Sequence, residues 1–237
     1  MTPVTIRVVP TLELMATVYR LSKDGGTRSA RFLGYVRAAK TGAPISGYNP
    51  MTSKPALAAV EALMAMRAEE RVERIANQIA NELGFLDDTD MNLSVSTPEM
   101  WTDRLGTEIH HRFAAKDPRG ILWWCDDIPT LELLDAEIAA QTVRMISTIR
   151  DGAPTSLRAA VTQEGAARAV SDAVGLYDEC AAQALAILES DTSLASKVGC
   201  LYGDVAATAM GFTPLGLGER VGFPHAVALA RSGALRG

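Results

Sequence analysis

A strand–helix–strand pattern in the middle of the chain constrains the fold more than any other feature. Residues 92–96 (NLSVS) have an extended pattern, Thr97-Pro98 is typical of a helix start, and that helix should continue to about Ala115. Residues 121–125 (ILWWC) then form a continuous apolar run, as in a strand covered on both faces. Two strands joined by a helix of this length are almost always parallel. The pattern therefore predicts a parallel sheet.

Most of the remaining chain favours helices. Residues 4–9 (VTIRVV) predict one further strand. Between 55 and 83, apolar residues recur by threes and fours, which predicts one helix of about eight turns. From Thr155 onward we expect helices over 155–170, 172–190 and 193–210, then coil over 212–224 and a short helix over 225–231. The predicted fold class is mainly helical α/β: a small parallel sheet (strands near 4–9, 92–96 and 121–125) covered by helices, with an all-helical C-terminal third.

Composition limits the class of protein. The 237 residues fit a single domain, with a possible subdivision into an α/β part (1–152) and a helical part (153–237). No apolar run approaches the roughly 18 residues that span a bilayer, so we expect no membrane partner. The net charge of −5 argues against nucleic-acid binding, which needs a basic surface. Three cysteines, an odd number, offer no disulfide framework, which favours a cytoplasmic location.

The residues that follow the last predicted strand are the best candidates for a site. Cys125, Asp126 and Asp127 leave the carboxyl end of that strand, where open α/β sheets bind their ligands. Adjacent carboxylates can hold Mg²⁺ or act as acid and base. Alternatively, one aspartate caps the next helix and the other is solvated. Because the crossover helix runs antiparallel to its strands, Trp101 and Arg104 should share this edge and clamp an anionic or planar ligand there.

The helical third contributes two further candidates, Tyr202 and Asp204. They follow Val198 in a segment with two glycines, which suggests close approach by another helix or a ligand. We expect them to close the pocket over the sheet edge. A polar pair in an alanine-rich helix, Gln163-Glu164, is a weaker candidate of the same kind. Helix packing or solvation is the alternative interpretation for each.

A metal site is a separate possibility. Glu108 and His111 form a Glu-x-x-His pair, which carboxylate-bridged di-metal bundles use twice, but this sequence contains no second pair. The alternative is an exposed turn near a helix C-terminus, where histidines are favoured by the helix dipole. The helix geometry predicts that His110 and His111 lie at the edge opposite Asp126 and Asp127.

Together these patterns predict a soluble cytoplasmic enzyme of hydrolase or lyase type that acts on a small polar or anionic molecule. Asp126 and Asp127 would be catalytic or would bind Mg²⁺, and the substrate-binding residues would be Trp101, Arg104, Cys125, Tyr202 and Asp204. No nucleotide-cofactor loop occurs in a strand–turn–helix context. One alternative is a non-catalytic scaffold that forms a homo-oligomer through the 55–83 helix. A second is a metal-binding helical protein that uses Glu108 and His111.

Overall fold

The computed structural model describes residues 6–20, 30, 33–34, 37, 56–97, 104–113, 118–171 and 173–234. The chain forms two compact units, each built from two stretches. Unit 1 comprises Met1–Thr107 with Arg119–Ile138, and unit 2 comprises Glu108–Pro118 with Ala139–Gly237. The division therefore passes through the interiors of two helices and does not lie near residue 152. Within the described ranges, no helix is long and apolar enough to cross a membrane.

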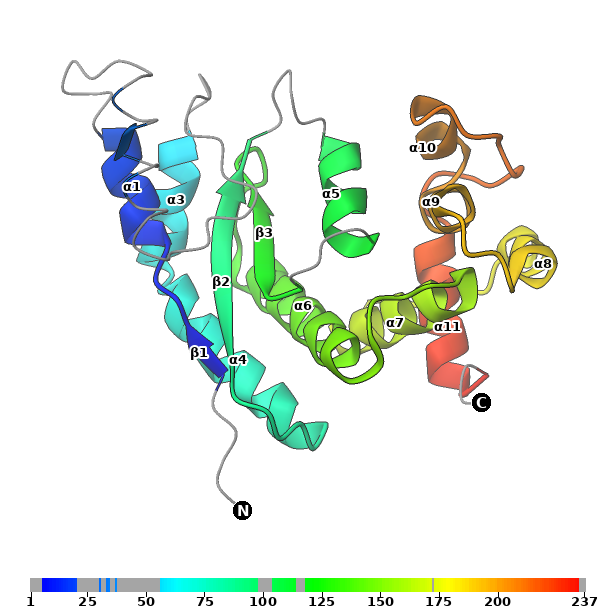
Figure 1. The fold of residues 1–237 in the computed structure, drawn as a ribbon, viewed down its shortest axis with the longest axis horizontal. Coiled ribbons are helices and arrows are strands. Elements are labelled where there is room, and N and C mark those ends of the chain that lie inside the picture. Colours follow the sequence, from blue (N-terminus) through cyan, green and yellow to red (C-terminus); the bar gives the residue numbers. More distant parts are fainter. Residues whose placement is uncertain are drawn as a thin grey trace. The chain divides into compact units, whose positions relative to one another are not determined.

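Unit 1 contains a parallel sheet in the order β1–β2–β3 (Figure 1). The strands are β1 (Ile6–Val8), β2 (Thr89–Ser96) and β3 (Gly120–Trp124). In the register, Ile6 of β1 lies opposite Thr89, and Trp124 of β3 lies opposite Ser96. Met91 and neighbouring apolar residues of the central strand are fully buried. The predicted parallel sheet is confirmed, except that positions 4 and 5 lie outside the described residues.

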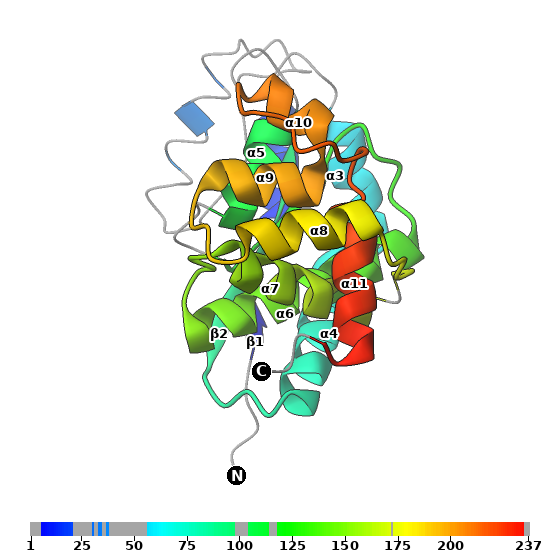
Figure 2. The ribbon, with the colours of Figure 1, turned by 90° about the vertical axis from the view of Figure 1, so that its right-hand side faces the viewer.

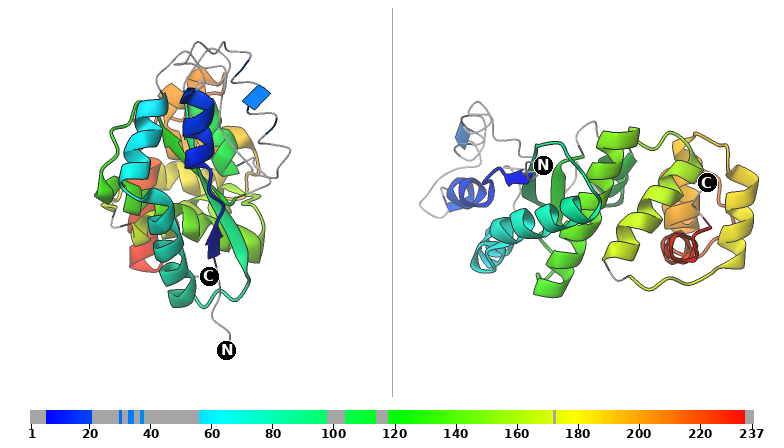
Figure 3. Two further views of the ribbon diagram at one scale, coloured as in Figure 1. Left: turned by 90° about the vertical axis from the view of Figure 1, so that its left-hand side faces the viewer. Right: turned by 90° about the horizontal axis from the view of Figure 1, so that it is seen from below.

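The apolar stripe predicted as one helix over 55–83 forms two helices instead, α3 (Ala56–Ala65) and α4 (Ala68–Glu82), which are seen one after the other in Figure 3. The break is at Arg67, whose backbone is left-handed (φ 54°, ψ 45°). A straight helix over 55–83 would be about 43 Å long, whereas the 8 residues of β2 span about 26 Å. Because of the break, α3 packs against α1 (Leu12–Arg20) and α4 packs against β1 and β2.

Most of the stripe is buried inside unit 1. Of the predicted positions 57, 60, 64, 68, 72, 75, 79 and 83, six are buried, Met64 is partly buried and Leu83 is 40% exposed. The buried side chains face the core of the unit and not a surface that a second copy of the chain could reach. The core interpretation of the stripe therefore holds, and the single long helix was wrong.

The connection from β3 into α6 (Leu131–Asp151) settles which residue caps that helix. The hydroxyl of Thr130 accepts a hydrogen bond from the backbone N–H of Leu133 at 3.2 Å. Thr130 therefore provides the side-chain cap, so the alternative in which Asp126 or Asp127 caps this helix was wrong. Helix α6 contributes residues up to Ile138 to unit 1 and the rest to unit 2.

In its described residues, unit 2 is helical, which confirms the all-helical C-terminal third. It contains the second half of α5 (Arg104–Phe113) and of α6, followed by α7 (Leu157–Val170), α8 (Glu179–Leu188), α9 (Leu194–Tyr202), α10 (Asp204–Ala209) and α11 (Gly222–Ser232). Figure 2 shows α8 and α9 side by side, with α11 against both. Three predicted boundaries were wrong: α8 begins only after its N-cap Asp178, Gly203 (φ 84°) separates α9 from α10, and α11 begins at Gly222.

Two glycines let the segment between α10 and α11 lie directly on α9. A Cβ at Gly222 would lie 1.8 Å from the carbonyl oxygen of Cys200, and a Cβ at Gly203 would lie 2.1 Å from that of Gly218. Both distances are far inside van der Waals contact, so only glycine allows this close approach. The approach brings Arg220 onto α9, where its backbone N–H donates to the carbonyl oxygen of Tyr202 at 2.9 Å.

Candidate functional site

At the carboxyl edge of the sheet in unit 1, Arg104 and Asp127 form an ion pair. The guanidinium donates from Nη1 to Oδ1 at 2.9 Å and from Nη2 to Oδ2 at 2.6 Å. This two-point geometry fixes the plane of the guanidinium as well as its position. Both side chains are about half-exposed, at 44% for Arg104 and 39% for Asp127. The prediction that the start of the crossover helix shares an edge with the end of β3 is therefore confirmed for Arg104.

Two tryptophans of β3 support this ion pair. The guanidinium carbon of Arg104 lies 5.3 Å from the centroid of the Trp124 ring, within the range of a cation–π contact. The indole N–H of Trp123 donates to the backbone carbonyl of Asp127 at 3.2 Å. Both indoles are buried, so they form a rigid base under the edge. Trp101, the predicted partner of Arg104, lies outside the described residues.

Cys125 and Asp126 complete the loop after β3. The backbone N–H of Cys125 donates to the carbonyl oxygen of Ser96 at 2.9 Å, which extends the sheet pairing by one residue. Its thiol donates to Oδ1 of the exposed Asp126 at 2.9 Å. The sulfur lies against a carboxylate, and such a neighbour does not favour Cys125 as a nucleophile.

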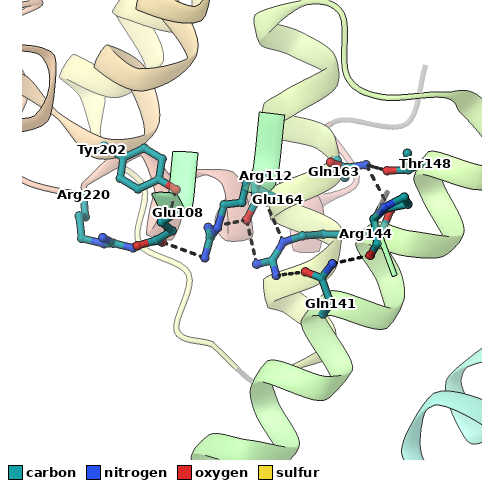
Figure 4. A network of polar contacts seen from close by, with 10 residues as sticks. Glu108, Arg112, Gln141, Arg144, Thr148, Gln163, Glu164, Tyr202 and Arg220 are labelled. Carbon is teal, nitrogen blue, oxygen red and sulfur yellow. Dashed lines mark hydrogen bonds and ion pairs between the residues drawn. The ribbon is translucent and has the colours of Figure 1, made fainter. Parts of the chain in front are cut away.

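A second cluster of charged residues lies in unit 2 and is centred on Glu164 of α7. Arg144 of α6 donates from Nε to Oε1 of Glu164 at 2.9 Å and from Nη2 to Oε2 at 3.1 Å. Arg112 of α5 donates to the same Oε2 at 3.1 Å (Figure 4). Glu164 is 1% exposed, and both arginines are almost as deeply buried. Three helices thus meet around one buried carboxylate.

Amides extend the network along α6. Nη1 of Arg144 donates to the side-chain oxygen of Gln141 at 3.2 Å. The side-chain amide of Gln163 donates to the hydroxyl of Thr148 at 3.0 Å. The polar pair Gln163-Glu164 noticed in the sequence is therefore a connection between α6 and α7.

Glu108 extends the network toward solvent. It accepts from Nη2 of Arg112 at 3.0 Å, from Nη2 of Arg220 at 2.8 Å and from the hydroxyl of Tyr202 at 3.3 Å. Arg220 is half-exposed, with its guanidinium carbon 5.0 Å from the ring centroid of Tyr202 and 5.2 Å from that of Phe223. Its backbone is left-handed (φ 56°), and this conformation is energetically unfavourable for any residue that carries a Cβ atom. The network therefore has a buried end at Glu164 and an accessible end at Arg220.

The buried arginines decide the protonation state of the two glutamates. Burial alone would raise the pKa of Glu164, but Arg144, Arg112 and Arg168 lower it to about 2. Burial also opposes ionisation of Glu108, yet Arg112 and Arg220 bring its pKa below the ordinary value. Both glutamates are therefore charged at neutral pH. They are held as counter-ions and are not poised to exchange protons near pH 7.

The predicted residues of the helical third have assigned contacts inside unit 2. The Tyr202 hydroxyl belongs to the network, and burial raises the pKa of this phenol. The carboxylate of Asp204 accepts backbone N–H groups from Leu215 at 2.7 Å and from Gly216 at 3.1 Å, which anchors the loop after α10. That these two residues close a pocket over Asp126 and Asp127 remains a prediction.

The carboxylate of the predicted metal pair, Glu108, is bound to two guanidinium groups and a phenol. Among the residues that the structure describes, no three His, Cys, Asp or Glu side chains are grouped so that they could hold a metal ion. Sequence reasoning missed Arg112 and Arg144 as members of the network. The available signal was the position of Arg112 four residues after Glu108, which is ion-pair spacing on a helix.

Comparisons of this chain with protein-family models, with curated proteins and with solved structures found no match.

Proposed function

We propose that the carboxyl edge of the sheet in unit 1 binds a small anionic molecule, with Arg104 as the group that holds the anion. The observation that carries this proposal is the half-exposed guanidinium of Arg104, which is stacked on Trp124 and oriented by two hydrogen bonds to Asp127. Because the stacking on Trp124 remains when Asp127 is displaced, the planar guanidinium keeps part of its orientation and loses less entropy when it binds a carboxylate or phosphate. An anion would compete with Asp127 for the same donors.

The proposed chemistry is that of a hydrolase or lyase. An anion on Arg104 displaces Asp127, whose carboxylate is then available beside the ligand as a general base. Asp126, exposed on the same loop, is the second carboxylate of the pair. Carboxylates in this position can also hold Mg²⁺ together with ligand oxygens, because Mg²⁺ prefers oxygen donors and retains several waters.

The other proposed properties follow from the same residues. The partner is a small molecule and not a nucleic acid, since the chain carries a net charge of −5. The three cysteines, all of which the structure describes, form no disulfide, which supports a cytoplasmic location. The scaffold alternative is less well supported, because most of the stripe that would form its seam is buried in unit 1. The metal alternative conflicts with the arginine contacts of Glu108.

Titration with two anions, pyrophosphate and citrate, tests the proposal. We expect at least one of them to bind the wild-type chain and to shift the fluorescence of the tryptophans under Arg104. Arg104→Gln should weaken that binding by about tenfold or more, since a charged hydrogen-bonding pair is lost. Arg158→Gln is the matched control, because Arg158 forms a similarly exposed ion pair with Glu189. No binding by the wild type, or equal binding by Arg104→Gln, would contradict the proposal.

A further inference from the structure

His225 of α11 is a buried histidine outside both charged clusters. It is 1% exposed. Its Nδ1 accepts a hydrogen bond from the backbone N–H of Asp178 at 3.2 Å. Because a backbone N–H can only donate, Nδ1 carries no proton in this structure, and the proton of the neutral ring resides on Nε2.

The surroundings of His225 fit only the neutral ring. Its Nε2 is buried, and no protein atom in the described part of the chain accepts a hydrogen bond from it. The ring of Tyr177 packs against the imidazole with centroids 5.1 Å apart. A second proton would place an N–H on Nδ1 directly against the N–H of Asp178. It would also put a charge where one polar atom of the ring already lacks a protein partner, which is costly.

The hydrogen bond to His225 holds the chain that leads into α8. Asp178 is the N-cap of α8, and its side chain accepts the backbone N–H of Ala181 at 2.7 Å. A second bond to α11 lies two residues earlier, where the backbone N–H of Leu176 donates to the carbonyl oxygen of Pro224 at 3.0 Å. The entry into α8 is therefore attached to α11 at two points. Only the point at Asp178 depends on a group that titrates.

Burial, and not a neighbouring charge, sets the direction in which the pKa of His225 is shifted. Helices α7, α8 and α9 pack against α11. On the α8 side, the carboxylate of Asp178 favours protonation of His225, but burial outweighs it and lowers the pKa of the imidazole. On α7, Glu164 is hydrogen-bonded to arginines, and the charge of Arg168 helps to lower the pKa values of Glu164 and Glu108. On α9, the ammonium of Lys197 donates to the carbonyl oxygen of Pro154.

We propose that His225 is an acid-sensitive latch: its protonation breaks the bond from Asp178 and loosens the entry into α8, while the bond between Leu176 and Pro224 remains as a pivot. Because the folded chain prefers the neutral ring, the stability that this contact contributes is complete above the ordinary histidine pKa of about 6.5. It is lost as the pH falls from there through the lower pKa of the folded chain. The change is local to unit 2.

Hydrogen exchange at single amides, followed by NMR on the full chain between about pH 7.5 and pH 4.5, tests this latch. As the pH falls from the ordinary histidine pKa of about 6.5 to the lower pKa of the folded chain, we expect the protection factor of the Asp178 amide to fall by up to about tenfold per pH unit, and to level off below that pKa. The amide of Ala159 is the internal control. It is capped at the start of α7 by the hydroxyl of Ser156, which does not titrate, so its protection should stay constant.

A variant of His225 that cannot titrate keeps the test decisive. In His225→Asn, the side-chain oxygen can accept the Asp178 N–H in place of Nδ1 but cannot titrate in this range. We expect the protection of the Asp178 amide in this variant to be independent of pH. The proposal is overturned if His225 does not titrate above about pH 4.5. It is also overturned if Asp178 protection stays constant while His225 titrates, or if the variant shows the same pH dependence as the wild type.

Discussion

The two charged clusters of this protein use the same side chains in opposite environments. In unit 1, one arginine and one carboxylate form an ion pair that is about half-exposed. In unit 2, the carboxylate of Glu164 is 1% exposed and is bound by two buried arginines. A pair in water contributes little stability and exchanges partners readily. When one member of a buried ion pair is removed, the other member keeps a charge that neither water nor another group compensates. The comparison teaches that exposure, and not residue type, separates a candidate binding group from a structural one.

The largest effect that this comparison predicts is the loss of the buried charge in Glu164→Gln. The change leaves Arg144 and Arg112 buried without their shared counter-ion, and we expect unit 2 to lose about 3–5 kcal/mol of unfolding free energy. Amide NMR signals of α7 during urea unfolding report on unit 2. Glu189→Gln, which removes one partner of an exposed pair, is the control and should cost less than about 1 kcal/mol. A loss of unfolding free energy below about 1 kcal/mol for Glu164→Gln would contradict the claim that the buried cluster is structural and the exposed pair is not.

A slightly smaller effect is expected from acid. The pKa of Glu164 is about 2 in the folded chain, against about 4.3 for an unperturbed glutamate. The stabilisation is therefore complete above about pH 4.3, and up to roughly 3 kcal/mol is lost as the pH falls toward 2. Urea unfolding at several pH values, compared with Glu164→Gln, isolates this contribution. The difference between the two proteins should shrink as the pH falls through this window, and a constant difference would show that Glu164 is not the group responsible.

The smallest change in stability is expected at the exposed pair. Asp127→Asn should alter the unfolding free energy of unit 1 by less than about 1 kcal/mol, because both partners remain hydrated. It should also tighten the binding of pyrophosphate or citrate by roughly threefold to tenfold, since it removes a neighbouring negative charge that competes for Arg104. Unfolding followed by tryptophan fluorescence and titration with the anion measure the two quantities. A large loss of stability would mean that this pair is as structural as the one in unit 2.

The features that depend on local sequence pattern, namely the strands and the crossover helix, could be predicted. The three parallel strands follow from short apolar or β-branched runs. The proximity of Arg104 to Asp127 follows from the geometry of a strand–helix–strand unit. The break at Arg67 could not be foreseen, because a stripe of apolar residues keeps the same spacing on both sides of it. A periodic pattern predicts which face of a helix is buried, but it does not predict where the helix is interrupted.

Long-range polar contacts were also beyond the pattern. Glu164 is bound by Arg112 from 52 residues away and by Arg144 from 20 residues away, so neither pair has a helical or strand period. The start of α1 is similar, because Glu69 accepts the backbone N–H groups of Thr11 and Leu12 from more than 50 residues away. Such pairs become visible only when the packing of the helices is known.

The most direct test of the central claim is to measure anion affinity and unfolding free energy on the same Arg104→Gln protein. The claim is that the exposed pair of unit 1 binds a ligand, whereas the buried network of unit 2 holds helices together. It predicts that affinity for pyrophosphate or citrate falls by about tenfold or more while the unfolding free energy of unit 1 changes by less than about 1 kcal/mol. Unchanged affinity in Arg104→Gln would contradict the claim.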